Sequence, residues 1–275
     1  MEWRLIHRTC YRFDNPVPLG PHQLRLRPSG PIAGTVRDHR LQIWPAPSLG
    51  HWRQDLWNNW VYQAWFAAPV KQLTLVSRFR FRPKAQNPFN FAVEREALTS
   101  PPTWGADWDK SVATYLQVGD RLDWLEPWKN YAGDSVALGV DLNRAVHQAI
   151  GYELRWEPGV QTPQETLNRG RGSCRDTAWL LVECLRQLGY PARFVSGYWL
   201  QTENSQGELH AWCEYYLPGA GWIGLDPTAG LVVNQQHVAL ARAPFPEAAA
   251  PLQGTHGAAD ADCSWDFQVR VVRSR

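Results

Sequence analysis

The stretch GSCRDTAWLLVECLRQLGYPARFVSGYW, residues 172–199, places a cysteine at the start of an apolar helix that leads directly into a strand. Ser173, followed three residues later by Asp176, has the form of a capping box, which predicts Ser173 as the N-cap and Cys174 as the first helical residue. Apolar residues at helical spacing continue from there, and the helix is expected to end at Gly189. A helix that feeds a strand in this way indicates an α+β arrangement for this part of the chain.

The rest of the chain divides by pattern into a β part and an α+β part. Residues 1–84 contain alternating runs separated by turns rich in Pro, Gly and Asn, which predicts a β-sandwich domain. Residues 85–105 follow neither period and are expected to be a linker. Residues 106–275 are expected to form a core of helices followed by an antiparallel sheet, with an irregular tail over 229–264 and a last strand over 264–272. The predicted fold class is therefore α+β.

Composition and charge describe an ordinary globular chain. The 275 residues are 44% hydrophobic and 20% charged, and the formal net charge is +2. Positive charge is concentrated in residues 1–95, where arginines alternate with other residues in HQLRLRP (22–28) and SRFRFRP (77–83). Such alternation is typical of the solvated face of a half-buried strand, so no nucleic-acid partner is predicted.

The sequence carries no pattern for a membrane span or for a disulfide framework. It has no run of about 18 apolar residues, and its first residues are unlike a secretory leader, so we expect a cytoplasmic protein without a membrane partner. The five cysteines are scattered and form no CxxC pair, which argues against disulfides and against a structural zinc site. They are Cys10, Cys174, Cys184, Cys213 and Cys263.

The position of Cys174 is suited to a nucleophile. At a helix N-terminus a thiol faces unsatisfied backbone N–H groups and the positive end of the helix dipole, which favour the thiolate and can bind an anionic oxygen. A thiolate nucleophile needs a base and a group that orients the base. In ELHAWCEYYLPGAGWIGLDPTAG, residues 208–230, His210 lies on a strand, PGAG forms a turn and Asp226 lies on the returning strand. The hairpin is expected to bring Asp226 back toward His210.

Each of these residues also has an ordinary structural interpretation. Cys174 could be a small buried residue, His210 a core histidine and Asp226 a turn residue before a proline. Taken together and in this order, the three favour catalysis. The other histidines, His237 among them, are isolated in the sequence, and motifs for binding a metal, a phosphate, a dinucleotide or calcium are absent from it. The sequence therefore predicts chemistry without a metal or a cofactor.

Three blocks of the chain resemble a known family. They are HRTCYRFDNPVPLGPHQLRLRP (7–28), GSCRDTAWLLVECLRQLGYPARFVSGYW (172–199) and HAWCEYYLPGAGWIGLDPT (210–228). In this order they resemble the bacterial transglutaminase-like proteins, in which an N-terminal β domain precedes a transglutaminase core of the papain-like superfamily. The resemblance implies that the predicted α+β part is such a core.

The same resemblance implies roles for individual residues. Cys174 is then the nucleophile, His210 the base and acid, and Asp226 the residue that orients His210. The motif LRWEPG (154–159) puts Trp156 where the family has an aromatic residue that supports the oxyanion hole. A Trp that simply packs is the alternative for Trp156, and no calcium site is carried over.

These residues lead to an expected function and to two alternatives. We expect a cysteine-dependent enzyme that acts on a peptide or carboxamide bond of a peptide or protein substrate through a thioester, with hydrolysis by a cysteine protease or amidase favoured over transfer to an amine. The first alternative is a protein-glutamine transglutaminase. The second is a non-catalytic scaffold with the transglutaminase fold, whose basic N-terminal domain recognises a partner.

Overall fold

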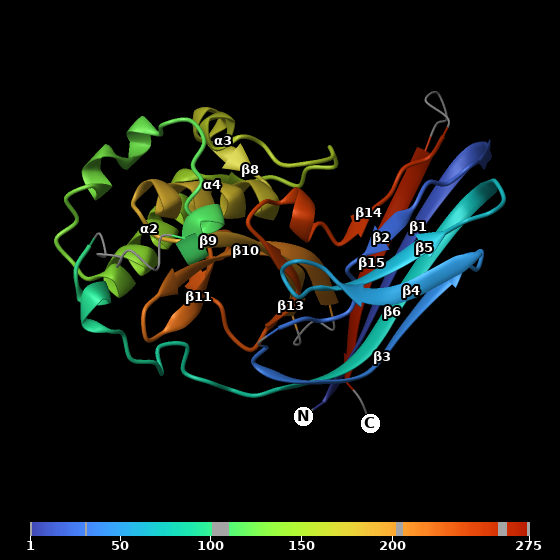
Figure 1. Cartoon of the computed structure of the whole chain (residues 1–275), viewed down its shortest axis with the longest axis horizontal. Coiled ribbons are helices and arrows are strands. Elements are labelled where there is room, and N and C mark those ends of the chain that lie inside the picture. Colours follow the sequence, from blue (N-terminus) through green and yellow to red (C-terminus); the bar gives the residue numbers. More distant parts are fainter. Residues whose placement is uncertain (1, 31, 101–109, 202–205, 258–262, 274–275) are drawn as a thin grey trace.

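The fold was examined in a computed structural model, which describes residues 2–30, 32–100, 110–201, 206–257 and 263–273. A β-sandwich and a helical half lie side by side, and one sheet runs through both (Figure 1). The predicted α+β class with an N-terminal sandwich is confirmed.

The shared sheet has nine strands, all paired antiparallel. Its order is β12-β11-β10-β15-β1-β6-β3, and β9 pairs with both β10 and β13. The strands are β1 (Trp3–Val17), β3 (Gly34–Trp44), β6 (Val70–Pro83), β9 (Ala192–Gln201), β10 (Gln206–Leu217), β11 (Gly221–Asp226), β12 (Leu231–Val232), β13 (His237–Ala243) and β15 (Cys263–Arg273).

A second, four-stranded sheet closes the sandwich. Its order is β14-β2-β5-β4, formed by β14 (Leu252–Gln253), β2 (His22–Leu24), β5 (Trp60–Trp65) and β4 (Leu49–Gln54). The inward side chains of the two sheets share one apolar cluster that includes Leu5, Leu24 and Phe79, each at most 1% exposed. The alternating pattern of the first 84 residues supplies the apolar side chains that are buried in this cluster.

The helices gather at the end of the molecule away from the sandwich (Figure 1). They are α2 (Ser135–Ala149), α3 (Pro163–Arg169) and α4 (Cys174–Gln187), with 3-10 turns η1 (Arg95–Leu98), η2 (Ala113–Tyr115), η3 (Asp123–Trp128) and η4 (Glu247–Ala249). The short strands β7 (Gly151–Tyr152) and β8 (Arg171–Gly172) pair in parallel just before α4. The apolar stripe of α4 packs on the sheet in one cluster with Cys213 and Leu225, which fixes the N-terminus of this helix against β10 and β11.

The last strand lies in the sandwich rather than in the helical half. We expected it within the core, but β15 pairs with β1 from Trp3↔Arg273 to Phe13↔Cys263, which also places the two termini next to each other. Among the described residues, it pairs with β10 at Gln206↔Arg270 and Gly207↔Val269. A Cβ atom on Gly207 would lie 2.9 Å from the side chain of Val269, so the close approach of these strands requires glycine. The division of the chain near residues 84 and 106 stays a prediction.

Two expectations about local structure need correction or qualification. The tail 229–264 was expected to be irregular, but it contains β13, a strand of seven buried residues at the edge of β9. Apolar residues at helical spacing over 107–117 also predict a helix; this stretch falls partly outside the described residues, and its described part ends in the 3-10 turn η2.

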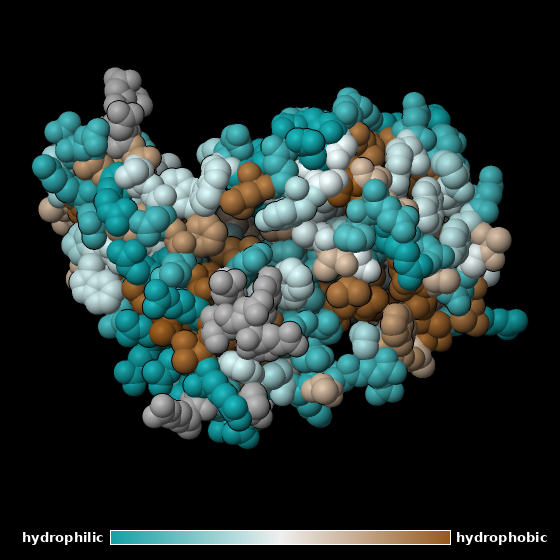
Figure 2. Space-filling model, turned by 180° about the vertical axis from the view of Figure 1, so that it is seen from behind, coloured by the Kyte–Doolittle hydropathy of each residue, from teal (hydrophilic) through white to brown (hydrophobic). Residues whose placement is uncertain are grey.

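The surface is largely hydrophilic on the face opposite that of Figure 1, with apolar residues in limited patches (Figure 2). Within the described ranges, no helix combines the length and the apolar composition that crossing a bilayer requires.

Candidate active site

Cys174 is the first residue of α4, as the capping-box pattern predicts. Asp176 Oδ2 accepts hydrogen bonds from both the backbone N–H and the hydroxyl of Ser173, each at 2.7 Å. Its Oδ1 accepts from the backbone N–H of Gln161 and from an Arg155 Nη1, also at 2.7 Å. Burial alone would raise the pKa of Asp176, but these hydrogen bonds hold it below its usual value. One carboxylate thus fixes the turn that presents the half-buried thiol of Cys174.

The β10–β11 hairpin brings His210 and Asp226 together as predicted. In the register of this hairpin, Cys213 pairs with Leu225, which precedes Asp226 at the end of β11 farthest from the turn. The imidazole Nε2 of His210 donates to Asp226 Oδ2 at 2.8 Å, and both side chains are buried. The second nitrogen, Nδ1, is not used by Asp226, and the Cys174 side chain lies close enough to the imidazole to contribute to raising the pKa of His210. Cys174, His210 and Asp226 are therefore brought together as a row, in that order.

The row favours a charged imidazole. Burial alone would lower the pKa of His210, but the charge and hydrogen bond of Asp226, together with those of Cys174, outweigh burial and raise it to about 10. Burial likewise acts to raise the pKa of Asp226, and the interactions with His210 and His237 hold it well below its usual range. A buried carboxylate thus favours the protonated form of the His210 imidazole.

The backbone also stabilises the Asp226 carboxylate. Its Oδ1 accepts from the backbone N–H groups of Thr228 at 3.0 Å and Ala229 at 3.2 Å. Both donors follow Pro227 in the turn after β11, so the proline that ends the strand also sets up the turn that holds the carboxylate.

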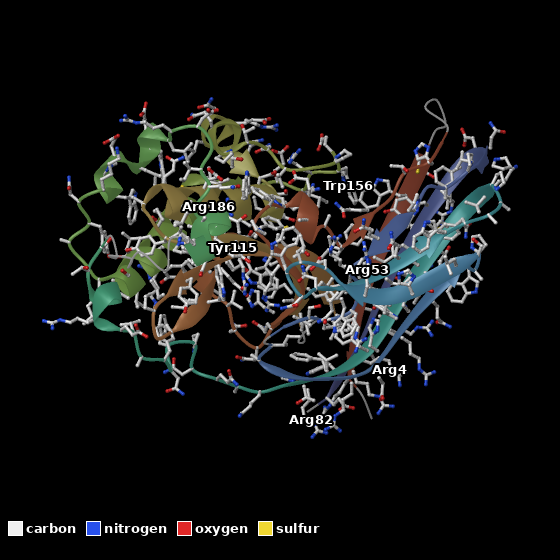
Figure 3. All side chains as sticks on the ribbon, in the orientation of Figure 1. Arg4, Arg53, Arg82, Tyr115, Trp156 and Arg186 are labelled. Carbon is white, nitrogen blue, oxygen red and sulfur yellow. The ribbon has the colours of Figure 1, made fainter. Side chains whose placement is uncertain are left out.

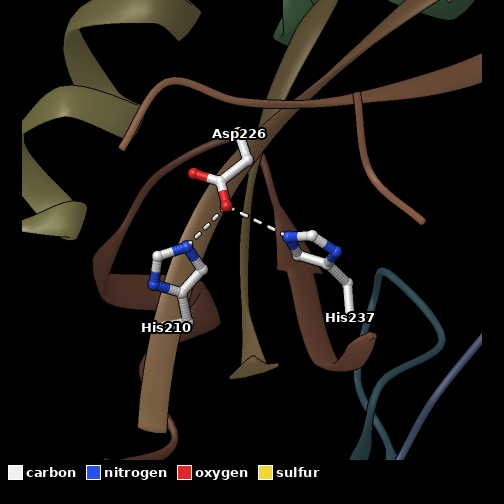
Figure 4. Close-up of side chains that lie close together, drawn as sticks. All are labelled: His210, Asp226 and His237. Carbon is white, nitrogen blue, oxygen red and sulfur yellow. Dashed lines mark hydrogen bonds and ion pairs between the residues drawn. The ribbon is translucent and has the colours of Figure 1, made fainter. Parts of the chain in front are cut away.

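His237 was expected to be isolated, and this expectation was wrong. Its Nε2 lies 3.0 Å from Asp226 Oδ2, so one carboxylate oxygen is shared by two imidazoles (Figure 4). His237 opens β13, the strand that the sequence did not reveal. The one available signal was a histidine at the start of an apolar run, NQQHVALA, and this signal does not point to Asp226.

Two tryptophans enclose the imidazoles. The Trp199 ring lies 5.4 Å from the His210 ring and is stacked on the His237 ring at 6.3 Å. Trp212 meets His237 edge-on at 5.3 Å. The cluster is therefore buried, and its polar groups are satisfied by one another and by nearby backbone N–H groups.

Three atoms of this cluster could also be considered as metal ligands. His210, Asp226 and His237 each offer one such atom, and these atoms lie within 4.8 Å of one another. However, both N···O contacts, at 2.8 and 3.0 Å, have hydrogen-bond length, which places a proton rather than an ion between each pair. The arrangement is thus a hydrogen-bonded cluster.

Trp156 lies on the loop before α3, pointing toward the sandwich (Figure 3). Its ring is 56% exposed and packs edge-on against Trp265 at 5.5 Å and near Phe267 at 6.3 Å, both on β15. Arg175 ties this loop to α4 by donating to the carbonyl of Glu157 at 3.2 Å. The ring contacts recorded for Trp156 in the described residues are with β15, so its oxyanion role stays a prediction.

Comparison with known proteins matches both halves of the chain. Residues 3–82 match the bacterial transglutaminase-like N-terminal region, and residues 132–227 match the transglutaminase-like superfamily core. The second match includes the predicted nucleophile, base and orienting residue.

Individual relatives agree with these matches. An uncharacterized protein of Mycobacterium leprae is 26% identical over 94% of this chain and 95% of its own length. A protein-glutamine gamma-glutamyltransferase of Pseudomonas aeruginosa is 38% identical, over 32% of this chain and 14% of its own length. Among solved structures, a candidate cysteine protease from Cytophaga hutchinsonii has a similar fold, with a TM-score of 0.74 at 16% identity over 100% of this chain and 92% of its own.

Proposed function

Because this chain belongs to the transglutaminase-like superfamily and carries the bacterial N-terminal region of that family, we propose that it is a cysteine-dependent enzyme that cleaves amide bonds of peptides or proteins. The observation that carries the proposal is that the helix-terminal Cys174 lies beside a buried His210 that is hydrogen-bonded to Asp226.

The first half of the reaction makes a thioester. The Cys174 thiolate attacks the carbonyl carbon, and the negative charge that develops on the carbonyl oxygen is stabilised by the backbone N–H of Cys174. His210 then gives its Nδ1 proton to the leaving nitrogen as the C–N bond breaks. Asp226 keeps its charge throughout and holds the imidazole in this orientation.

The second half returns the free enzyme. His210, now neutral, takes a proton from the incoming water or amine as its oxygen or nitrogen attacks the thioester carbonyl, and the C–S bond breaks to restore the thiolate. The imidazole keeps the proton, which regenerates the ion pair. With water the product is an acid, and with a primary amine it is a new amide.

We favour hydrolysis as the second half. Transfer to an amine is the second candidate, and the similarity to the gamma-glutamyltransferase of Pseudomonas aeruginosa supports it over 32% of the chain. We also propose Trp156 as a second oxyanion donor once substrate is bound; removal of one such donor typically costs about a hundredfold or more in kcat. The cytoplasmic location stays a prediction, checked by cell fractionation.

The test uses p-nitrophenyl acetate as an activated acyl donor and follows both p-nitrophenol release and intact protein mass. A burst of p-nitrophenol with an acetyl group on Cys174 supports the proposal, and Cys174→Ala should abolish both. Cys263→Ser is the matched control, because Cys263 is an exposed thiol on β15. Unchanged acylation in Cys174→Ala would overturn the assignment of the nucleophile.

A second assay separates water from amine. The enzyme is incubated with casein, with and without the fluorescent primary amine monodansylcadaverine. Fluorescence incorporated into casein, with ammonia release stimulated by the amine, would favour the transferase. Cleavage of casein without incorporation would favour the protease, and ammonia release that ignores the amine would favour the amidase. The absence of all three, in a protein whose thiol also fails to acylate, would favour the scaffold.

A further inference from the structure

We propose that His237 is a positioning residue of the active site: by donating its Nε2 proton to Asp226 Oδ2, it holds the carboxylate in the orientation that turns His210 toward Cys174. The inference rests on the proposed function, because it concerns the same row of residues.

The hydrogen-bond pattern assigns the proton on His237 to Nε2. That atom lies 3.0 Å from a carboxylate oxygen, which can only accept. On the other side of the ring, the backbone N–H of Asn234 donates to Nδ1 at 3.3 Å. The side-chain oxygen of Asn234 also lies 3.3 Å from Nδ1, but it accepts from the backbone N–H of Gln236 at 2.9 Å. A neutral ring with its proton on Nε2 satisfies these contacts.

The Asp226 carboxylate is held on both oxygens. Two backbone N–H groups donate to Oδ1, and His210 and His237 both lie within hydrogen-bond distance of Oδ2. Without His237, rotation about the Cβ–Cγ bond would be opposed on the Oδ2 side by His210 alone, which is the group that has to be oriented. Donors on two sides of Oδ2 remove this freedom, since rotation would break one of them (Figure 4). Asp226 is fully buried, so a lost hydrogen-bond partner leaves a costly unsatisfied charge.

The fold keeps His237 in place independently of His210. The ring is 3% exposed, stacked on Trp199 and edge-on to Trp212. Its strand, β13, pairs with β9 and not with the β10–β11 hairpin that carries His210 and Asp226. Strand β13 thus holds His237 in a position that is set separately from the hairpin residues His210 and Asp226. The titratable groups in the described contacts of His237 are Asp226 and, at 6.1 Å between ring centroids, His210.

Two variants separate positioning from packing. His237→Phe keeps an aromatic ring between the two tryptophans but removes the donor. His237→Gln keeps an N–H donor near the position of Nε2. The matched control is His51→Gln, since His51 is an exposed histidine on β4 in the sandwich.

The readout is the rate at which iodoacetamide alkylates Cys174, followed by peptide mass spectrometry at about pH 6 and about pH 9, below and just above the free-thiol pKa of about 8.5. The ratio of the two rates does not depend on protein concentration, and only folded variants are compared, because an unfolded chain reacts as a free thiol. We expect His237→Phe to lower the rate at pH 6 about 10-fold, as outer hydrogen-bond partners of active sites commonly do, with a smaller change at pH 9. His237→Gln should recover most of the loss, and His51→Gln should match the wild type.

The outcomes distinguish this inference from the proposed function. If the alkylation rate at pH 6 is high relative to that at pH 9 in the wild type, and the ratio is the same in His237→Phe, only the positioning role is overturned. A wild type that reacts only as a free thiol would overturn both. If His237→Phe does not fold, His237→Leu removes the same donor with a smaller side chain and should lower the ratio in the same direction; a wild-type ratio in that variant would also contradict the inference.

Discussion

Asp226 lies diagonally across from His210 on the same face of the β10–β11 hairpin, and this placement joins the carboxylate to the imidazole at 2.8 Å. Since Cys213 pairs with Leu225, Asp226 stands opposite position 212, two residues from His210. Diagonal neighbours on one face are within reach of each other's side chains. A register shift of one residue would turn Asp226 to the other face and break the row.

The first prediction concerns the charge of Asp226. Asp226→Asn keeps the shape of the side chain but removes the charge that raises the pKa of His210. We expect the acylation rate to fall about 10³–10⁴-fold, the effect that this change has in other triads. Acylation by p-nitrophenyl acetate measures it. Asp266→Asn, an exposed carboxylate on β15, is the control and should act as wild type.

The second prediction concerns stability against pH. His210 holds its proton to about pH 10 when folded and to about 6.5 when unfolded. Between these values unfolding releases a proton, so the stabilisation is fully present below about pH 6.5 and is lost as pH rises toward 10. Urea unfolding at several pH values should show a steeper loss of free energy of unfolding in the wild type than in His210→Gln. Parallel curves would argue against a charged His210.

The third prediction concerns the ion cluster that Glu214 forms with Arg193 and Arg242. Glu214 accepts from Arg193 Nε at 2.7 Å and from Arg242 Nε at 3.0 Å. Glu214→Gln leaves two buried guanidinium groups without their counter-charge and should lower the free energy of unfolding by about 3–5 kcal/mol. The exposed Glu126, which pairs with Lys129, provides the control, and Glu126→Gln should have a much smaller effect because solvent screens this pair. Equal costs for the two variants in urea unfolding would contradict the account of the cluster.

The fourth prediction concerns the packing of α2 on β10. A Cβ atom on Gly139 would lie 2.5 Å from the hydroxyl oxygen of Tyr215, whose ring is buried and whose hydroxyl donates to the carbonyl of Ser135. Gly139→Ala should therefore lower the free energy of unfolding by about 1–3 kcal/mol, despite alanine's better helix propensity. Gln148→Ala, at an exposed position of α2, should be neutral or slightly stabilising. A stabilised Gly139→Ala would show that the ring can move away.

The parts of the site that depend on local chemistry could be predicted from the sequence. The Ser173–Asp176 pattern predicted that α4 begins at Cys174, because capping is decided by residues three positions apart. The turn after Leu217 predicted the hairpin, and the hairpin in turn brought Asp226 toward His210, because the loop length sets the register of such a pair.

The parts that depend on distant pairing could not be predicted. All seven residues of β13 are buried, so the strand shows no alternation and resembles an irregular Ala-rich segment. Its pairing with β9 is what carries His237 to Asp226, and no local pattern encodes it. The pairing of β15 with β1 joins residues at least 250 positions apart, and it is selected by burial in the sandwich.

The most direct test of the account is the rate of Cys174 alkylation by iodoacetamide from about pH 5 to pH 10, in the wild type and in His210→Ala. The account predicts fast alkylation well below the free-thiol pKa of about 8.5, and loss of the low-pH reactivity in His210→Ala. A wild-type rate that rises only near pH 8.5 and does not change when His210 is removed would contradict the thiolate–imidazolium pair, and with it the proposed enzyme.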